Sequence, residues 1–496
     1  MARFPRGPLN SCRRSSAAWG VFMAAFAVAS ASGPSPEPVD LGSRLEPLVD
    51  RFLIQSLAGG ARLQLHKPQR REVVLVHDAP WEGNLTAHHT LFRDGGIYRM
   101  YYGGRHYEPG QAVRHVLVCY AESRDGIHWT RPNLGQFEYE GSRANNIVWM
   151  NDPWAGSEQR NPLAVFKDSN PDAAPEARYK SIARGDDGVY ALKSPDGIHW
   201  SLLSKEPVIP KGDMSLDSQN LAFWDRLRGR YVCYLRSGRT HPTGQRVRDV
   251  KTAVSRDFLT WSEPVFLEYP GALVEHLYTH PIRPYARAPH IYLGFPKRFV
   301  PERNQDREFS GVSDGIFMSS RDGIRFHRWG EAVVRPGLQP ERWVTRNNMI
   351  GWGILTLPSS VAGEPEELSI YAAEGYYSGP ASRLRRYTYR LDGFVSVRAP
   401  LAGGEMTTRP IRFSGSRLVL NYSTSAAGSI RVEIQDETGE PVPGYSLQDS
   451  RELFGDSVEQ EVSWKGTSDL GSLSGRTVRL GFLLKDADLY ALRFLP

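Results

Sequence analysis

The chain has 496 residues and a formal net charge of +6, from 61 Lys and Arg against 55 Asp and Glu. Four of the arginines fall in the first 31 residues, so the remainder is nearly neutral and contains no basic run or basic patch interleaved with aromatics. Binding to nucleic acid needs such a patch, so nucleic acid is excluded as an expected partner. The length exceeds that of one ordinary domain, which predicts a large closed architecture or two domains.

Residues 1–31 are predicted to be a secretory signal peptide. They combine arginines with an apolar run at 17–29 that is too short to span a bilayer, followed by small residues. An uncleaved anchor is the alternative. No later stretch is long and uncharged enough to cross a membrane, so we expect a secreted, periplasmic or extracellular protein without membrane contact beyond export. Residues 32–70 are expected to form a linker or lead-in segment.

A seven-residue pattern recurs along the chain at intervals of 61 to 71 residues. It reads SRDGIHW at 123–129, SPDGIHW at 194–200, SRDFLTW at 255–261 and SRDGIRF at 320–326, and a weaker copy, RLDGF, ends at Phe394. The Ser and Asp side chains can bond the backbone of a tight turn, and Gly tolerates positive φ, so the aspartates are predicted to be structural. Five repeats flanked by strand-like runs predict a five-bladed β-propeller over 71–398.

The repeat stops near residue 399. Strand-like runs joined by Gly, Ser and Asp turns predict a β-sandwich over 399–496, which makes the expected fold class all-β. Cys119 and Cys233 lie in apolar strand-like runs of different repeats, so they are expected to be buried hydrophobic residues without a disulfide.

Five such repeats, with S-x-D-G-x-x-W turns and a trailing β-sandwich, resemble the furanosidase-type superfamily of glycoside hydrolases, families 32, 43, 68 and relatives. The chain looks like a divergent member. The resemblance implies a funnel on the propeller axis with three carboxylates from the inner strands of the first three blades. One carboxylate must give a proton while another attacks or activates water.

The first two blades depart from the family pattern. In blade one, FRDGGIYRMYY at 92–102 looks like the family's R-D-G turn, and this places the axial Asp near His88; Glu82 is the replacement candidate, with a surface-loop acid as the alternative. In blade two, Arg160 and Asn161 resemble the start of the family's R-D-P motif. An amide can bond a sugar hydroxyl but supplies no charge. Asp168 is expected to cap a turn.

The other blades supply further candidates. Asp217 in blade three stands where the family has its general acid, and a carboxylate entering a buried strand is costly unless it is paired or functional. Glu275 in blade four is a second catalytic candidate, with an ion pair to Arg283 or Arg298 as the alternative. The remaining residues are expected to bind or stack on sugar, or to bridge blades: Tyr278, Arg346, Asn347, Asn348, Glu374, Trp81, Trp149 and Trp154.

No cofactor or metal site is expected. His88 and His89 are adjacent, so along a strand they point to opposite faces and cannot share a metal. The resemblance allows a structural Ca²⁺ on the axis, without support from any residue pattern.

The sequence therefore predicts hydrolysis of a glycosidic bond in an extracytoplasmic oligo- or polysaccharide, with Asp217 as general acid and Glu82 or Glu275 as base or nucleophile. The alternative is a carbohydrate-binding propeller without catalysis, because His88 and Asn161 replace acids of the family. A third interpretation makes the β-sandwich the glycan-binding or cell-surface module. The oligomeric state, the sugar and the stereochemical outcome stay open.

Overall fold

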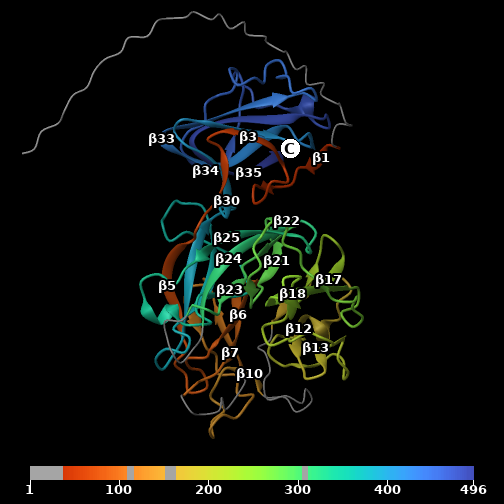
Figure 1. Ribbon diagram of the computed structural model, residues 1–496, viewed down its shortest axis with the longest axis vertical. Helices are drawn as coiled ribbons and strands as arrows, with labels where there is room; N and C mark the ends of the chain where they lie inside the picture. Colours follow the sequence, from red (N-terminus) through yellow and green to blue (C-terminus); the bar gives the residue numbers. More distant parts are fainter. Residues whose placement is uncertain (1–36, 109–116, 151–163, 304–310) are drawn as a thin grey trace, which may run out of the picture. The chain divides into compact units, whose positions relative to one another are not determined.

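The computed structural model describes residues 37–108, 117–150, 164–303 and 311–496 (Figure 1). Apart from short 3-10 turns, these residues form strands and loops, which confirms the all-β class. None of the described residues belongs to a helix long and apolar enough to cross a membrane. The expected signal peptide lies outside the described residues.

The described sheets of the propeller are five blades, in chain order. Blade one contains β6 (Ala87–Asp94), β7 (Ile97–Gly104), β8 (Leu117–Ser123), β9 (Trp129–Thr130) and β10 (Ile147–Met150). Blade two contains β11 (Phe166–Lys167), β12 (Tyr179–Arg184), β13 (Gly188–Ser194), β14 (Ser201–Leu202) and β15 (Ile209–Pro210). Blade three contains β16 (Leu221–Asp225), β17 (Arg230–Thr240), β18 (Arg246–Ser255) and β19 (Val265–Phe266).

Blade four has the most strands of the five blades. Blade four contains β20 (His276–Leu277), β21 (Ile282–Tyr285), β22 (Ala288–Gly294), β23 (Lys297–Val300), β24 (Val312–Ser320) and β25 (Phe326–Val334). Blade five contains β26 (Met349–Ile350), β27 (Leu355–Leu357), β28 (Glu367–Glu374), β29 (Arg383–Arg390) and the N-terminal strand β5 (Gln69–Val76), which pairs with β29. Pairing of β5 with β29 closes the ring of blades, and the five-bladed propeller predicted from the repeats is confirmed.

The strands β6, β11, β16 and β21 lie nearest the propeller axis. A cavity of about 590 Å³ is lined jointly by residues of these four strands and by Trp352 of blade five. Thr90 of β6 also forms a bridge to Trp352. Since the strands share one lining, they converge on the axis.

The repeated turns are built as the sequence predicts. In the first copy, Ser123 Oγ accepts a hydrogen bond from the N–H of Gly126 at 2.9 Å, and Asp125 Oδ1 accepts from the N–H groups of Ile127 and His128, both at 2.8 Å. The same bonds recur around Asp196, Asp257 and Asp322. These aspartates therefore have backbone partners in every full copy, which confirms their structural role.

Tyrosines connect three of these four turns to a neighbouring blade. Tyr101 of blade one donates to the carbonyl of Gly197 in blade two at 3.0 Å, and Tyr234 of blade three donates to Gly323 in blade four at 3.0 Å. Tyr371 of blade five donates to Gly126 in blade one at 2.6 Å. The turns thus hold the ring together as well as the individual sheets.

The C-terminal segment forms a second β unit, consistent with the expected sandwich. Its strands are β30 (Val395–Ala399), β31 (Gly404–Thr408), β32 (Ile411–Phe413), β33 (Arg417–Gln435), β34 (Asp456–Glu461) and β35 (Arg479–Leu495). Most of its core side chains, such as Trp464 and Phe482, come from this segment.

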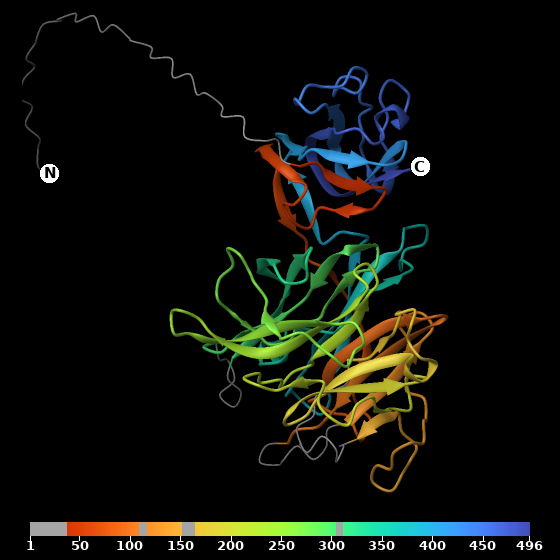
Figure 2. The same ribbon diagram turned by 90° about the vertical axis from the view of Figure 1, so that its right-hand side faces the viewer.

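The segment 32–70 is not a simple lead-in. It contains four strands that pair with the C-terminal strands: β1 (Val39–Gly42) with β32, β2 (Glu46–Pro47) with β35, β3 (Ile54–Gly59) with β31, and β4 (Arg62–Leu65) with β30. Figure 2 shows these red strands among the blue C-terminal ones. Leu41, Leu48 and Leu53 are buried in that core. A local sequence pattern cannot reveal such pairing, because the partners are more than 300 residues apart.

One buried carboxylate joins the second β unit to blade four. Glu46 of β2 is fully buried, and it lies 2.6 Å from Arg321 Nη2 and 2.9 Å from His290 Nε2. Asp50 binds the same Arg321 at 2.9 Å. Burial opposes the charge on Glu46, but His290 and Arg321 lower its pKa to about 2.

Candidate functional site

Tyr278 lies at the centre of a group of positively charged side chains from three blades. It follows β20 and comes four residues before β21. Its ring centroid lies 4.1 Å from Lys297 Nζ, 5.8 Å from the guanidinium carbon of Arg236, 5.9 Å from that of Arg248 and 6.0 Å from that of Arg346. These distances are within the range of cation–π attraction. We refer to these five residues, with Asp217, His88 and Arg105, as the Tyr278 cluster.

The cluster forms where the inner strands begin. Asp217 comes just before β16 and Arg346 just before β26, whereas His88 lies in β6. Arg236 and Arg248 project from β17 and β18, and Lys297 from β23. Segments of blades one, three, four and five therefore meet at this end of the axis.

Asp217 and Tyr278, both predicted site residues, are brought together. The Tyr278 hydroxyl donates to the backbone carbonyl of Asp217 at 3.1 Å. One carboxylate oxygen of Asp217 lies 2.9 Å from Arg236 Nε, and the side chain is 44% exposed. Asp217 is thus an accessible carboxylate held beside an aromatic ring and a guanidinium.

His88 occupies the position where the resemblance places an axial Asp. Burial, together with the positive charges of Arg105, Lys297 and Arg346, lowers the pKa of His88 well below its usual value, so its ring is neutral. Its backbone carbonyl accepts a hydrogen bond from Gln219 Nε2 at 3.2 Å. A neutral imidazole can bond a sugar hydroxyl in either direction but supplies no negative charge.

Lys297 is the most deeply buried cation of the cluster. Its side chain lies in β23, the residue is 1% exposed, and none of the described hydrogen bonds or ion pairs involves its ammonium group. Burial, and then the charges of Arg346 and Arg248, lowers the pKa of Lys297 well below its usual value. Lys297 is not among the residues predicted from the sequence, although a lysine inside the apolar run LGFPKRF is a detectable signal.

Backbone strain concentrates around the same cluster. Of the ten described non-glycine residues with positive φ, five belong to the cluster or adjoin it: His88, Leu216, Arg346, Asn348 and Tyr377. Such conformations cost energy and tend to occur at functional sites. Arg346, one of these residues, lies next to Tyr376, whose hydroxyl accepts a hydrogen bond from Arg346 Nη1 at 3.4 Å.

Glu82 is not at the cluster but in the interior of blade one. It is 2% exposed, and its Oε1 accepts from the Tyr102 hydroxyl at 2.6 Å and from Arg131 Nε at 3.0 Å. Oε2 accepts from Arg131 Nη2 at 3.0 Å and from the N–H of Ala79 at 3.2 Å. Both oxygens are saturated, so this carboxylate is structural and the catalytic prediction for Glu82 is corrected.

Glu275 forms the alternative ion pair anticipated for it. It lies 3.0 Å from Arg298 Nη1 and 2.7 Å from Arg328 Nη1. Arg298 and Lys297 are consecutive in β23, so their side chains point to opposite faces of the sheet. Glu275 is therefore on the face away from Lys297 and the cluster, and its catalytic prediction is also corrected.

Glu374 and Trp81 stabilise the packing of their own blades and do not belong to the Tyr278 cluster. Glu374 is fully buried, with both oxygens 2.9 Å from Arg385 Nε. The indole of Trp81 donates to Asn146 Oδ1 at 2.7 Å. Asn347 and Asn348 are buried among backbone and Arg342 partners and so bridge segments of blade five.

Several predicted residues cannot be placed in this way. Arg160, Asn161 and Trp154 lie outside the described residues, whereas Trp149 is described and half-buried. Asp168 pairs with the buried Lys180 and accepts from the Tyr231 hydroxyl, so it is structural, as expected. Across residues 37–108, 117–150, 164–303 and 311–496, no group of three or more His, Cys, Asp and Glu side chains could hold a metal ion.

Comparisons with known proteins give a fold likeness. No family model matches the chain. Two curated relatives, the uncharacterized proteins MT1551 (strain CDC 1551 / Oshkosh) and Rv1502 (strain ATCC 25618 / H37Rv) of Mycobacterium tuberculosis, are 29% identical over 154 and 153 residues. Each match covers 30% of this chain and 45% of the relative, so the similarity spans less than half of the relatives' length.

Solved structures of carbohydrate-active enzymes are also similar. A structure named glycoside hydrolase has 15% identity and a TM-score of 0.44, and covers 65% of this chain and 92% of its own. A thermostable family-43 glycoside hydrolase has 12% identity and a TM-score of 0.43 over 67% and 97%. An N-acetylgalactosamine deacetylase from F. plautii, in complex with blood group B trisaccharide, has 14% identity and a TM-score of 0.43 over 67% and 96%.

The neighbours include glycoside hydrolases. At such low identity and TM-score the likeness concerns the fold alone, and it identifies neither the reaction nor the substrate of this chain.

Proposed function

We propose that the protein is an exported carbohydrate-active propeller that binds a sugar at the Tyr278 cluster and hydrolyses a glycosidic bond there. The supporting observation is the convergence of four blades on Tyr278, where aromatic rings, guanidinium groups and one accessible carboxylate lie together. Asp217 is the proposed general acid, which gives its proton to the leaving-group oxygen. Aromatic rings such as Tyr278 and Tyr376 suit the apolar face of a sugar.

Binding without turnover is the second candidate function. It is favoured by the positions of Glu82 and Glu275, which are held by arginines elsewhere and cannot act as the second carboxylate. Glycoside hydrolysis by the common route needs two such groups on either side of the scissile bond.

A comparison of Asp217→Asn with Asp213→Asn separates the two candidates. Asp213 is an exposed carboxylate four residues earlier, paired with Lys251 at 2.8 Å, so its variant is a matched control. We expect release of reducing sugar from a polysaccharide panel to fall at least a hundredfold in Asp217→Asn and to persist in Asp213→Asn, in line with the 10²–10⁴-fold that general acid catalysis typically contributes. Sugar binding in calorimetry without turnover by the wild type would instead establish the second candidate.

Export is proposed on the N-terminal sequence alone. Mass spectrometry of the protein secreted from an expression host tests it: we expect a mature N-terminus close to residue 32. Recovery of intact chain in the membrane fraction would support the uncleaved anchor.

A further inference from the structure

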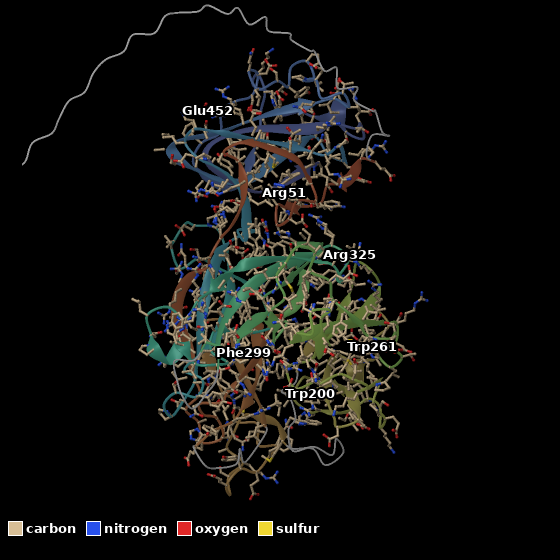
Figure 3. All side chains as sticks on the ribbon, viewed as in Figure 1. Arg51, Trp200, Trp261, Phe299, Arg325 and Glu452 are labelled. Atoms are coloured by element: carbon tan, nitrogen blue, oxygen red, sulfur yellow. The ribbon has the colours of Figure 1, made fainter. Side chains whose placement is uncertain are left out.

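The cluster contains more positive charge than its described partners neutralise. Arg236 has a carboxylate partner, Asp217, at 2.9 Å. Arg248 instead contacts the ring nitrogen of His276 at 3.4 Å and lies 4.9 Å from the ring centroid of Phe299, which Figure 3 labels. Arg346 contacts the hydroxyl of Tyr376. In the described ion pairs neither Arg248 nor Arg346 has a carboxylate partner.

Other buried cations of the same protein are paired. Seven described Lys and Arg side chains are buried, and six of them have a carboxylate partner within 4 Å; the pairs are Lys180–Asp168, Arg236–Asp217, Lys251–Asp213, Arg328–Glu275, Arg342–Glu374 and Arg386–Glu367. Lys297 is the exception among the described residues. An unpaired buried charge is costly, so a protein that retains one has a use for it.

We propose that the sugar bound at the Tyr278 cluster carries an acidic group, a sulfate ester or a carboxylate, whose oxygens contact Lys297, Arg248 and Arg346. This inference rests on the proposed function only in that a sugar binds there, and it does not require turnover. Arginine suits bidentate binding of such oxygens and lysine supplies a point charge. The ring of Tyr278 holds the three cations together beside the acidic group.

The protonation of Lys297 links ligand charge to proton uptake. The groups that face it are Arg346, Arg248, Arg236 and Asp217, with His88 in β6 of blade one. Burial and the neighbouring guanidinium groups lower the pKa of Lys297, so its amine loses a proton more readily than that of an ordinary lysine. An anion beside it raises that pKa, so binding of an acidic sugar takes up a proton, whereas binding of a neutral sugar does not.

The test measures binding by calorimetry to matched pairs of ligands. One pair is sulfated galactan oligosaccharide and its desulfated form, and the other is oligogalacturonate and its methyl ester. We expect the charged member of at least one pair to bind at least tenfold tighter than its neutralised form, and the preferred pair identifies sulfate or carboxylate. The heat of binding should also differ between buffers of different ionisation enthalpy, as proton uptake requires.

Two variants, each of which replaces one lysine by methionine, complete the design. Lys297→Met should remove the preference for the charged ligand, at least tenfold, while Lys251→Met, in the pair with Asp213 outside the cluster, should retain it. Loss of an unpaired buried charge leaves Lys297→Met folded, with a thermal midpoint no lower than that of the wild type, which is checked by scanning calorimetry. Equal binding of charged and neutral members, or an unchanged preference in Lys297→Met, overturns the inference.

The two proposals fail in different ways. If neutral glycans are hydrolysed, the activity is lost in Asp217→Asn and no charged ligand is preferred, then the hydrolase proposal stands and the acidic-ligand inference is overturned. If the charged ligand is preferred and no ligand is hydrolysed, then the acidic-ligand inference stands and the hydrolase proposal is overturned. Absence of binding to all four ligands overturns the inference for these two acidic groups, irrespective of turnover on other sugars.

Discussion

Charged and titratable side chains in the interior of this protein are satisfied in different ways. Most carboxylates have arginine partners, as Glu82 has Arg131 and Glu374 has Arg385. The buried histidines are instead kept neutral. His77 and His89 face each other with their Nε2 atoms 3.1 Å apart, which allows one to donate and the other to accept but leaves no place for a second proton.

The buried histidines predict a loss of stability in mild acid. Burial lowers the pKa of His89 to about 3, that of His280 to about 4, and that of His77 well below its usual value. Below pH 6.5 the unfolded chain binds protons at these sites and the folded chain does not. The free energy of unfolding should therefore fall as the pH drops from about 6.5 toward 4, by up to about 1.4 kcal/mol per pH unit for each histidine.

Denaturant unfolding of the wild type and two variants between pH 5 and 7 checks this expectation. His89→Gln should reduce the pH slope. His128→Gln should not, because His128 is exposed and Asp125 raises its pKa. Burial raises the pKa values of Glu82 and Asp249, so these two carboxyl groups make the free energy of unfolding rise as the pH drops. They therefore reduce the slope that the histidines produce. A slope that is the same in wild type and His89→Gln would contradict the assignment.

Sequence positions near the starts of inner strands could be predicted to lie together. Asp217, Tyr278, Arg346 and His88 come from such positions and meet at the Tyr278 cluster, whereas their roles stay predictions. For Glu275 the sequence offered both a catalytic role and the ion pair with Arg298 without deciding between them, and the pairing of Glu374 with Arg385 depends on strand pairing that the sequence does not reveal. Arg236 and Arg248 were missed because their approach to Tyr278 depends on strand pairing that the sequence does not reveal, whereas Lys297 had a signal in the apolar run around it.

At the scale of the element, the repeated turn has one unusual copy. Phe258 stands where the other full copies have glycine, and its φ is +69°. Its ring is fully buried and lies 5.0 Å from the ring centroid of Tyr231 and 5.6 Å from that of Trp261. The aromatic packing therefore compensates for an unfavourable backbone conformation.

This compensation predicts an inverted order of stability for two variants. Both Phe258→Ala and Phe258→Gly lose the ring, at a cost of about 3–5 kcal/mol. Only glycine also relieves the left-handed strain, so Phe258→Gly should be about 1 kcal/mol more stable than Phe258→Ala, the reverse of the usual order. Guanidinium unfolding curves measure the difference. Greater stability of the alanine variant would show that the strain is absent.

The blades could be predicted because the turns of the four full copies are stabilised by bonds within seven residues, which leave a sequence pattern. The four strands of 39–65 could not, since they look like isolated strands until their C-terminal partners are known. The closure of blade five by β5 is equally non-local.

For the molecule as a whole, Glu46 is the clearest test of how the second β unit is held to blade four. Glu46→Ala removes the partner of Arg321 and His290 and should lower the free energy of unfolding by about 3–5 kcal/mol. Its effect should shrink as the pH falls below about 4.5 toward 2, because the ion pair is lost when Glu46 protonates.

Glu452→Ala is a suitable control for that variant. Glu452, labelled in Figure 3, is exposed and pairs with Arg431 at 3.3 Å, so its removal should cost less than about 1 kcal/mol. Thermal unfolding followed by calorimetry measures both variants. Equal effects of the two substitutions would mean that the Glu46 ion pairs contribute nothing beyond a surface contact.

The pairing of early and late strands also changes how the third interpretation can be tested. Truncation at residue 399 is unsuitable for asking whether the sandwich is the glycan-binding module, because it removes most of the strands that pair with β1 to β4 and exposes Leu41, Leu48 and Leu53. Substitutions on the surface of the intact second unit are the appropriate test.

The position of β35 has a consequence for biosynthesis. This strand is the most C-terminal of the described strands, and it pairs with β2, β30, β31 and β33. When translation has reached residue 478, all the other strands of that sheet have been synthesised, but β35, with which several of them pair, has not. Until residues 479–495 are translated, β2 therefore has no partner strand, and the pairs β3–β31 and β4–β30 are not joined to each other. A premature stop codon before that point leaves the sheet in separate pieces.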